Sequence, residues 1–384
     1  PYRRFVSAPP RLGGVEAVPV LEPGRSFQLK EIMPPFTLRQ EPPADYSLSV
    51  WPVENNASFR AAFLALKDGL SVERLTEPCI VQGEQCAAGG FIVHPDIRRE
   101  KFAALLDKMR ISPCYASTAD GIKSRPVRLP RIALVETWFH DMDAGWTRYV
   151  FDSHAIPFTV LRPADFEKSE LIGRFDVLVF PDADKSILLE GKYKRQEEYV
   201  VSDYPPEYAK GIGKAGFEKL MTFLDQGGEI VSWGRSTELF MGRLEITRGK
   251  EKQEFQLPVR NLAESAAKEG LYCPGSLVRT LLAKDHALSQ GMPPEVGVFY
   301  RGRPILATSI PSWDMDRRVV GWFPEKELLL SGYLEKGEKL ANRTSLAWLA
   351  KGKGQLVLFA FNPQYRAATP ATYKLLFNAL LLNQ

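Results

Sequence analysis

Four aspartates and one arginine stand where side chains could bind a ligand. They are Asp141, Asp143, Asp182, Asp184 and Arg148. The aspartates follow the apolar runs 132–136 and 175–180, and open α/β sheets bind ligands where parallel strands end. Clustered carboxylates at such a crevice could hold a hard cation or a polyol. The simpler interpretation, which we favour, is that Asp143 caps a helix and the other aspartates are polar loop residues.

A thiol and an imidazole offer a second kind of chemistry. Cys273 could act as a nucleophile with His286 as its base, which would make the chain a hydrolase. A catalytic thiol usually lies at a helix N-terminus or beside a cation that lowers its pKa, whereas the Pro-Gly pair after Cys273 predicts a turn into a strand. A structural cysteine is therefore favoured. Cys79 and Cys86 could form a disulfide if they lie on neighbouring strands.

Three glycines match the dinucleotide-binding pattern G-x-G-x-x-G, namely Gly211, Gly213 and Gly216. That interpretation needs an apolar strand directly before the glycines, so that a pyrophosphate meets the N-terminus of the following helix. A Tyr-Pro-Pro loop precedes them instead, and no strand ending in an acidic residue follows. We favour a glycine-rich loop before a helix.

The elements that must position these residues begin after a proline-rich segment. The prolines of residues 1–45 predict a linker with one edge strand, because proline lacks the backbone donor. Residues 46–128 show a β-α-β-β-α pattern with two amphipathic helices, around Phe59 and Phe102. We expect a small α/β connecting module there.

Strands and helices alternate through much of residues 129–384. Apolar runs such as 132–136 and 229–233 are separated by predicted helices, one starting at Asp143 and one spanning 164–171. This alternation predicts an α/β fold with a doubly wound, mostly parallel sheet and helices on both faces. Residues 240–350 contain β-like segments whose place in the sheet the pattern does not fix.

Charge and composition exclude two classes of function. The chain of 384 residues has 50 basic and 46 acidic side chains and a net charge of +4, without a basic stripe, so we expect no nucleic-acid partner. Its apolar runs are far shorter than the roughly 20 residues of a membrane-spanning helix. The opening at Pro1, without a methionine or a signal peptide, leads us to expect a fragment of a longer polypeptide.

Several motifs recur together in one protein family. They are the segment 143–149, Phe180-Pro-Asp182, the segments 205–213 and 223–231, Pro274-Gly-Ser276, and the segments 359–366 and 376–379. As a set they resemble the C-terminal region of bacterial zinc carboxypeptidase-like proteins of the carboxypeptidase A superfamily. In those proteins a class I glutamine amidotransferase-like domain, which is flavodoxin-like in fold, follows the peptidase domain. The resemblance implies that residues 46–128 connect the two and that residues 129–384 form the amidotransferase-like domain.

The resemblance also implies where a glutaminase triad would lie. The family's cysteine nucleophile sits on a sharp turn after the strand at 229–233, where this chain has Gly234. The family's histidine and glutamate follow the late strand at 356–361, where this chain has Asn362 and Gln364. Neither amide can transfer a proton near neutral pH, so we expect no glutaminase activity.

The resemblance therefore implies a non-catalytic accessory region of a zinc metallocarboxypeptidase-like hydrolase. It would support an upstream peptidase domain in cis or bind a peptide or glycan, and the parent would be secreted or periplasmic. Zinc would belong to that upstream domain; no cofactor is expected in this chain, whose four histidines are isolated. Two alternatives stay open: a stand-alone carbohydrate- or ligand-binding protein of the same fold, and a hydrolase that uses Cys273 and His286.

Overall fold

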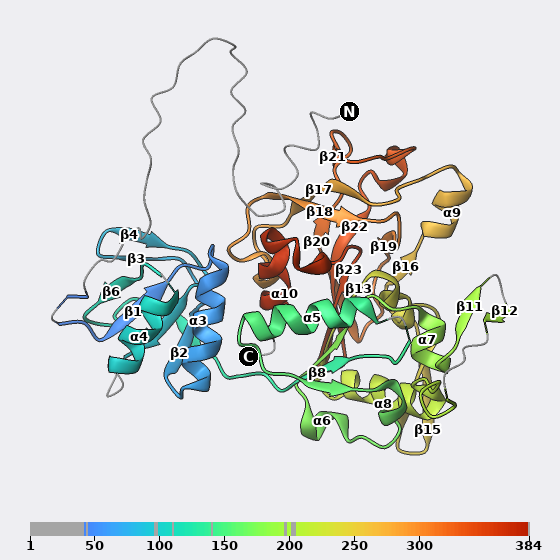
Figure 1. Cartoon of the computed structure of the whole chain (residues 1–384), viewed down its shortest axis with the longest axis horizontal. Helices are drawn as coiled ribbons and strands as arrows, with labels where there is room; N and C mark the ends of the chain where they lie inside the picture. Colours follow the sequence, from blue (N-terminus) through green and yellow to red (C-terminus); the bar gives the residue numbers. More distant parts are fainter. Residues whose placement is uncertain are drawn as a thin grey trace, which may run out of the picture.

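The computed structural model describes residues 42–43, 45–95, 99–109, 111–139, 141–195, 198–200 and 205–382. The linker or edge strand predicted for residues 1–45 falls almost entirely outside this set. Two sheets with their own helices organise the described residues, the smaller at the left of Figure 1 and the larger at the right. None of the described helices has the length and apolar content that a membrane crossing requires.

A five-stranded antiparallel sheet forms the small module, in the order β6-β1-β5-β2-β7. Its strands are β1 (Leu48–Trp51), β2 (Ser71–Leu75), β5 (Phe91–His94), β6 (Cys114–Ala116) and β7 (Ser124–Pro126). Helix α3 (Asn56–Lys67) joins β1 to β2, and helix α4 (Arg99–Met109) joins β5 to β6. This is the split β-α-β topology of ferredoxin-like modules. A hairpin of β3 (Cys79–Val81) and β4 (Glu84–Cys86) is inserted between β2 and β5.

Five parallel strands form the centre of the larger sheet. In spatial order they are β9 (Thr159–Leu161), β8 (Ile132–Val135), β10 (Val177–Phe180), β13 (Glu229–Trp233) and β23 (Gly354–Phe359). In order of appearance along the chain this is 2-1-3-4-5, the flavodoxin-like arrangement of a doubly wound sheet. Every residue of β8, β10 and β13 is buried, as expected of strands covered on both faces. The predicted α/β fold class is confirmed.

Antiparallel strands from residues 240–350 extend the sheet beyond β23. They follow in the order β22 (Thr344–Lys351), β20 (Met315–Trp322), β17 (Ser276–Leu282) and β18 (Glu295–Tyr300). Three short strands pair at the margins: β16 (Val259–Asn261), β19 (Leu306–Thr308) and β21 (Leu329–Ser331). Two further hairpins are β11–β12 (Tyr193–Arg195 and Glu198–Val200) and β14–β15 (Leu244–Arg248 and Glu251–Phe255).

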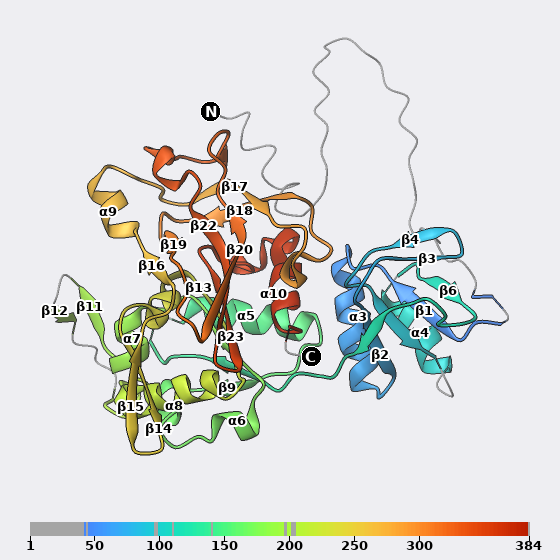
Figure 2. The same cartoon turned by 180° about the vertical axis from the view of Figure 1, so that it is seen from behind.

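Helices cover both faces of the parallel strands. Helices α5 (Met142–Ser153) and α10 (Tyr373–Ala379) lie on the face seen in Figure 1, and α8 (Gly213–Asp225) lies on the face seen in Figure 2. The helix predicted for 164–171 is wrong: the chain forms a 3₁₀ turn, η2 (Pro163–Asp165), and a short helix, α6 (Leu171–Arg174). Phe166 and Leu171 are both buried, but five residues apart they would point to different sides of one continuous helix.

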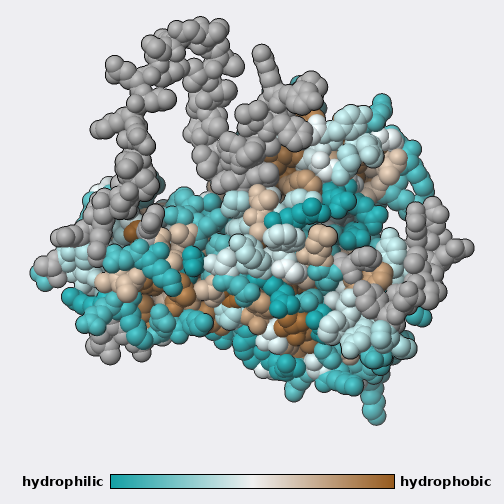
Figure 3. Space-filling model, in the orientation of Figure 1, coloured by the Kyte–Doolittle hydropathy of each residue, from teal (hydrophilic) through white to brown (hydrophobic). Residues whose placement is uncertain are grey.

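The small module packs against α10 through polar contacts. Asn56 Nδ2 donates to the carbonyl of Pro370 at 2.8 Å, and Arg125 Nη2 donates to that of Leu381 at 3.0 Å. Between them Arg74 Nη2 donates to Asn378 Oδ1 at 2.5 Å. Arg74 is 2% exposed although it is charged, so this contact lies inside the core that the two units share. The surface of the molecule shown in Figure 3 is mostly hydrophilic or mixed, with small apolar patches.

Candidate functional site

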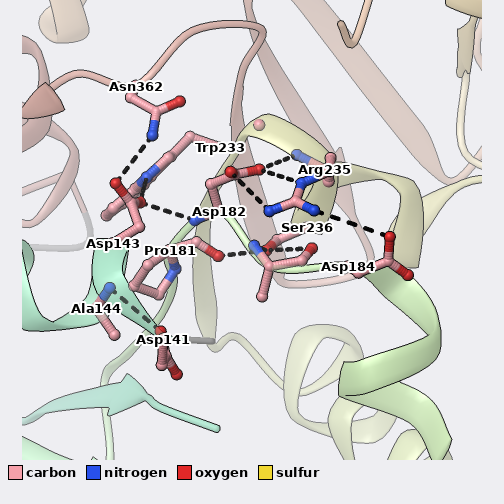
Figure 4. Close-up of polar contacts among 12 residues, drawn as sticks. Asp141, Asp143, Ala144, Pro181, Asp182, Asp184, Trp233, Arg235, Ser236 and Asn362 are labelled. Atoms are coloured by element: carbon pink, nitrogen blue, oxygen red, sulfur yellow. Dashed lines mark hydrogen bonds and ion pairs between the residues drawn. The ribbon is translucent and has the colours of Figure 1, made fainter. Parts of the chain in front are cut away.

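The loops that follow β8, β10, β13 and β23 meet at one edge of the parallel sheet (Figure 4). They bring together the side chains of Asp143, Asp182, Asp184, Arg235, Asn362 and Gln364, with Gly234 between them. These residues include three of the four predicted aspartates and all three positions of the predicted degenerate triad. These side chains therefore meet at the ends of the strands, and their contacts decide what they can do.

Asp141, rather than Asp143, caps helix α5. Its carboxylate accepts hydrogen bonds from the backbone N–H of Ala144, at 3.3 Å, and from that of Thr137. The cap predicted at Asp143 is therefore two residues too late, because the helix begins at Met142 and Asp143 lies in its first turn. Burial raises the pKa of Asp141 to about 6, against the opposing effect of its backbone donors.

Asp143 accepts four hydrogen bonds from neutral donors. Its Oδ2 receives the backbone N–H of Asp182, at 2.9 Å, and the indole N–H of Trp233, at 2.5 Å. Its Oδ1 receives Asn362 Nδ2, at 2.9 Å, and Gln364 Nε2, at 3.0 Å. We call these five residues the Asp143 cluster. A carboxylate has about four lone-pair sites, so internal donors already occupy those of Asp143.

Burial governs the electrostatics of this carboxyl group. It raises the pKa of Asp143 to about 6, and the nearby charge of Asp182 acts in the same direction, while the donors from Asp182, Trp233 and Asn362 oppose the rise. At neutral pH the group is therefore ionised and solvated by protein dipoles instead of water. The four donors offset part of the cost of burying this anion, and they occupy the lone pairs that a ligand or a proton donor would need.

Asp182 is paired with Arg235. Its Oδ1 accepts from the backbone N–H and from Nε of Arg235, at 2.7 and 3.1 Å, and its Oδ2 accepts from Nη2 at 3.1 Å. Burial alone would lower the pKa of Arg235, but the hydrogen bonds and charge of Asp182 outweigh it and raise that pKa. Asp184 lies 3.9 Å from the same guanidinium and caps helix α7 (Lys185–Glu190) through the N–H of Ser186.

Gly234 occupies the turn where the resemblance places a nucleophile. Its φ of +61° lies in the left-handed region, and the turn leads directly from β13 into the 3₁₀ segment Gly234–Phe240. A Cβ added there would lie 2.4 Å from Asp182 Oδ1. The space that a nucleophilic side chain would need is thus filled by the Asp182–Arg235 pair.

The contact described for Arg148 is with Glu136, which is outside this cluster. Arg148 pairs with Glu136 at 3.3 Å, and Arg162 approaches the other oxygen of the same carboxylate at 3.3 Å. The guanidinium of Arg162 also lies 3.7 Å from the ring centre of Trp138, and the Trp138 ring contacts Tyr208 edge to face. Trp138 is 48% exposed, so one fixed, partly open aromatic ring stands beside the Arg162–Glu136 pair.

The sequence did not lead us to expect that α5 exposes large apolar side chains. Met142, Trp146 and Tyr149 are all exposed, and they share the outer face of α5, opposite its buried residues. Their spacing of four and three residues places them on one side of a helix. That spacing was a readable signal, but tryptophans in an α/β domain are most simply taken as core residues.

The other candidate chemistry is engaged in structural contacts. Cys273 is buried and its thiol donates to the carbonyl of Tyr300, and burial raises its pKa. His286 Nδ1 accepts the N–H of Leu288, and burial lowers its pKa. A Cβ at Gly211 would lie 2.2 Å from the backbone of Leu189, so that glycine permits close packing. The described residues include no group of three or more side chains placed to hold a metal ion.

Neither a family model nor a curated protein matches this chain. Solved structures with similarity include a ThuA-like protein from Bacteroides uniformis, at 9% identity and a TM-score of 0.35, covering 65% of this chain and 89% of that one. A glutamine amidotransferase from Thermotoga maritima has 11% identity and a TM-score of 0.34, covering 66% and 99% of the two chains. A β-galactosidase from Bacillus circulans has 11% identity and a TM-score of 0.33, and the match covers 65% of this chain and 31% of that enzyme. The α/β fold class follows from the strand order itself, and a zinc peptidase parent stays a prediction.

Proposed function

We propose that this chain is a non-catalytic, amidotransferase-like accessory region of a zinc metallocarboxypeptidase-like hydrolase. The observation that carries the non-catalytic part is the Asp143 cluster. A side-chain amide replaces each of two proton-transferring residues, and both amides donate to a buried carboxylate. Gly234 supplies no nucleophile, and Asp182 fills the space beside it.

The parent protein is proposed from the motif resemblance. An upstream peptidase domain would provide the zinc site, and this region would support that domain or help it select substrates. Export of the parent to the periplasm or the cell exterior belongs to the same proposal. The buried contacts between the small module and α10 support a firm connection between this region's two parts, which a supporting role requires.

Binding of a peptide or a glycan is the second part of the proposal, and it belongs beside the Asp143 cluster instead of within it. Trp138 is held by Arg162 on one side and Tyr208 on another, which fixes its orientation before a ligand arrives. A preoriented aromatic ring loses little conformational entropy on binding. The charged groups of Glu136 and Arg148 at the same place could form hydrogen bonds with either ligand.

Two activity assays test the non-catalytic part. The intact chain is incubated with glutamine, and ammonia release is followed; no release above that of buffer is expected. Hydrolysis of carboxypeptidase substrates by the same chain is also expected to be absent, with or without added zinc. Glutamine turnover that a thiol reagent abolishes would overturn the proposal, and the Cys273→Ser variant would then show which thiol is responsible.

The natural gene product tests the accessory part. We expect it to carry a zinc peptidase domain upstream of Pro1. Deleting residues 46–384 from that product should lower its thermal stability or change its preference among peptide substrates. A natural product without a peptidase domain would favour the stand-alone binding protein.

Paired aromatic variants test the binding site. Arrays of peptides and oligosaccharides identify a ligand of the intact chain, and Trp138→Ala should weaken its binding at least tenfold. Tyr333→Ala is the matched control, because Tyr333 is 55% exposed but lies in the antiparallel part of the chain. Equal affinities for the wild type and both variants would exclude Trp138 as the binding residue.

A further inference from the structure

Three cysteine thiols of the small module lie together. Cys79 in β3 and Cys86 in β4 stand directly opposite each other in the hairpin register. Cys114 begins the neighbouring strand β6. The thiol of Cys86 is close enough to interact electrostatically with both of the others. All three are reduced in this structure.

The turn of the hairpin fixes this pairing. Gln82 and Gly83, the two residues between the strands, have φ values of 49° and 83°. Two consecutive positive φ angles are the mark of a tight two-residue hairpin turn, and such a turn allows one register. Opposed residues of antiparallel strands have Cα atoms roughly 4.5 to 5.5 Å apart, within the range that a disulfide needs. The opposition of Cys79 and Cys86 is therefore a consequence of the turn.

The surroundings make the two thiols unequal in access. Cys86 is buried in a small apolar cluster with Leu48, Val50 and Ile92, on the side of the module's sheet that the hairpin covers. Cys79 packs at the edge of that cluster and is partly exposed. A reagent from solvent therefore reaches Cys79 first, and Cys86 is the thiol in position to complete the reaction.

Cys114 is held as a thiol. Its Sγ donates to Glu84 Oε2 at 3.1 Å. Burial and this carboxylate raise the pKa of Cys114 far above its usual range, because a thiolate there would lie beside a negative charge. The thiolate is the species that attacks a disulfide, and burial raises the pKa of Cys79 and Cys86 as well. Cys114 differs because its thiol donates directly to a carboxylate, which makes it the least reactive of the three.

We propose that Cys79 and Cys86 form a disulfide across the β3–β4 hairpin, while Cys114 keeps its proton. The oxidant is a low-molecular-weight or protein disulfide. The Cys79 thiolate attacks one sulfur of the oxidant, forming a mixed disulfide and releasing one thiol. Cys86 then attacks the Cys79 sulfur, which breaks the mixed bond and releases the second thiol. The two cysteines lose two electrons and two protons, and the oxidant gains them.

The disulfide would fasten the hairpin over the apolar cluster that it covers. It closes the loop of residues 79–86 and restricts the unfolded chain. Such a bond persists in oxidising compartments, so it makes the stability of the module depend on where the protein resides. This inference concerns a site remote from the Asp143 cluster and does not rest on the function proposed above.

The test oxidises the intact chain with glutathione disulfide, alkylates the remaining thiols after unfolding, and maps the peptides without reduction. We expect two of the four cysteines to be protected, a mass lower by about 2 Da before alkylation, and one peptide pair linking Cys79 to Cys86. Cys114 and Cys273 should be alkylated. The melting temperature should rise by a few degrees on oxidation and fall back with dithiothreitol.

Single variants make the assignment specific. Cys79→Ser and Cys86→Ser should each abolish the linked peptide and the melting shift, and Cys79→Ser serves if the buried Cys86→Ser variant does not fold. Cys273→Ser is the matched control in the other domain and should keep both effects. Four alkylated cysteines after oxidation, a stable glutathione adduct at Cys79, or a bond between Cys86 and Cys114 would each overturn the proposal.

Discussion

Two buried charged side chains, one at the edge of the parallel sheet and one between the small module and α10, have only neutral hydrogen-bond partners. Asp143 lies at the edge of the parallel sheet and accepts from one backbone and three side-chain donors. Arg74 lies between the small module and α10, where it donates to Asn378 Oδ1 and to the carbonyl of Gly89 at 3.2 Å. The rings of Phe59 and Phe91 lie 5.7 and 5.5 Å from its guanidinium carbon.

The difference lies in what each charge organises. The donors to Asp143 come from the loops after β10 and β23 and from the last residue of β13, so this anion joins three segments of one domain. Arg74 draws its partners from both units, so this cation holds the module on the domain. Burial lowers the pKa of Arg74 to about 9, which leaves it protonated at neutral pH. Neutral dipoles can solvate either sign of charge, provided that the fold orients them.

Removing the anion should have the largest effect. Asp143→Ala leaves four donors without their acceptor, and we expect the free energy of unfolding to fall by about 4 kcal/mol. Urea denaturation measures the change. Asp152→Ala, an exposed carboxylate on the same helix, is the control and should change stability by less than about 0.5 kcal/mol. A loss of similar size in both variants would remove the special role of Asp143.

The pH dependence of stability distinguishes the anion from the cation. Because the folded Asp143 carboxyl binds its proton more tightly than the unfolded one, the free energy of unfolding should fall as pH rises from about 4 to about 6. A pKa rise of about two units corresponds to about 3 kcal/mol over that window. Subtracting the profile of Asp143→Asn isolates this group. A difference curve that rises with pH would mean that the pKa is lowered instead.

Removing the cation should cost less. Arg74→Met keeps the apolar contacts with Phe59 and Phe91 but loses two hydrogen bonds, and it also removes the desolvation cost of the charge. We expect a loss of about 2 kcal/mol, with earlier proteolysis between the module and the domain. Arg125→Met, a half-buried arginine at the same interface, should lose less than about 1 kcal/mol. Equal losses would show that the position, and not the buried charge, matters.

Replacing Arg148, an exposed charged residue, should change the stability of the protein least. Arg148 is paired with Glu136 at the surface, so Arg148→Ala should change the free energy of unfolding by at most about 0.5 kcal/mol. The difference should shrink further in 0.5 M salt, measured by urea denaturation. A loss near that of Asp143→Ala would place Arg148 in the cluster after all.

Local sequence patterns predicted where helices and strands lie better than they predicted which of these elements contact one another. The short buried strands β8, β10 and β13 alternate with amphipathic helices, so period and length sufficed to locate them. The antiparallel partners β17 to β22 were not placed, because pairing between strands far apart in sequence leaves no local period. The start of α5 was misplaced by two residues, since Asp141 and Asp143 are both acceptable caps and tertiary contacts decide between them.

In the candidate site, too, the residues could be predicted from the sequence but their contacts could not. Its aspartates were predicted because they follow strands, and the loss of the triad was expected from the family resemblance. That Asn362 and Gln364 both donate to Asp143 could not be read from the sequence, since more than 200 residues separate them from it. The pairing of Arg148 with Glu136 depends on the side-chain direction at one turn of α5, which spacing alone does not give.

The crowded turn at Gly234 has a consequence for the history of such a chain. Introducing a thiol there takes more than one substitution, because a Cβ at that position meets the Asp182 carboxylate, which is itself paired with Arg235. A chain that acquired a side chain at this turn would first have to break the ion pair, and it would lose stability in doing so. Under the proposed non-catalytic function, this cost keeps the turn closed to a nucleophile.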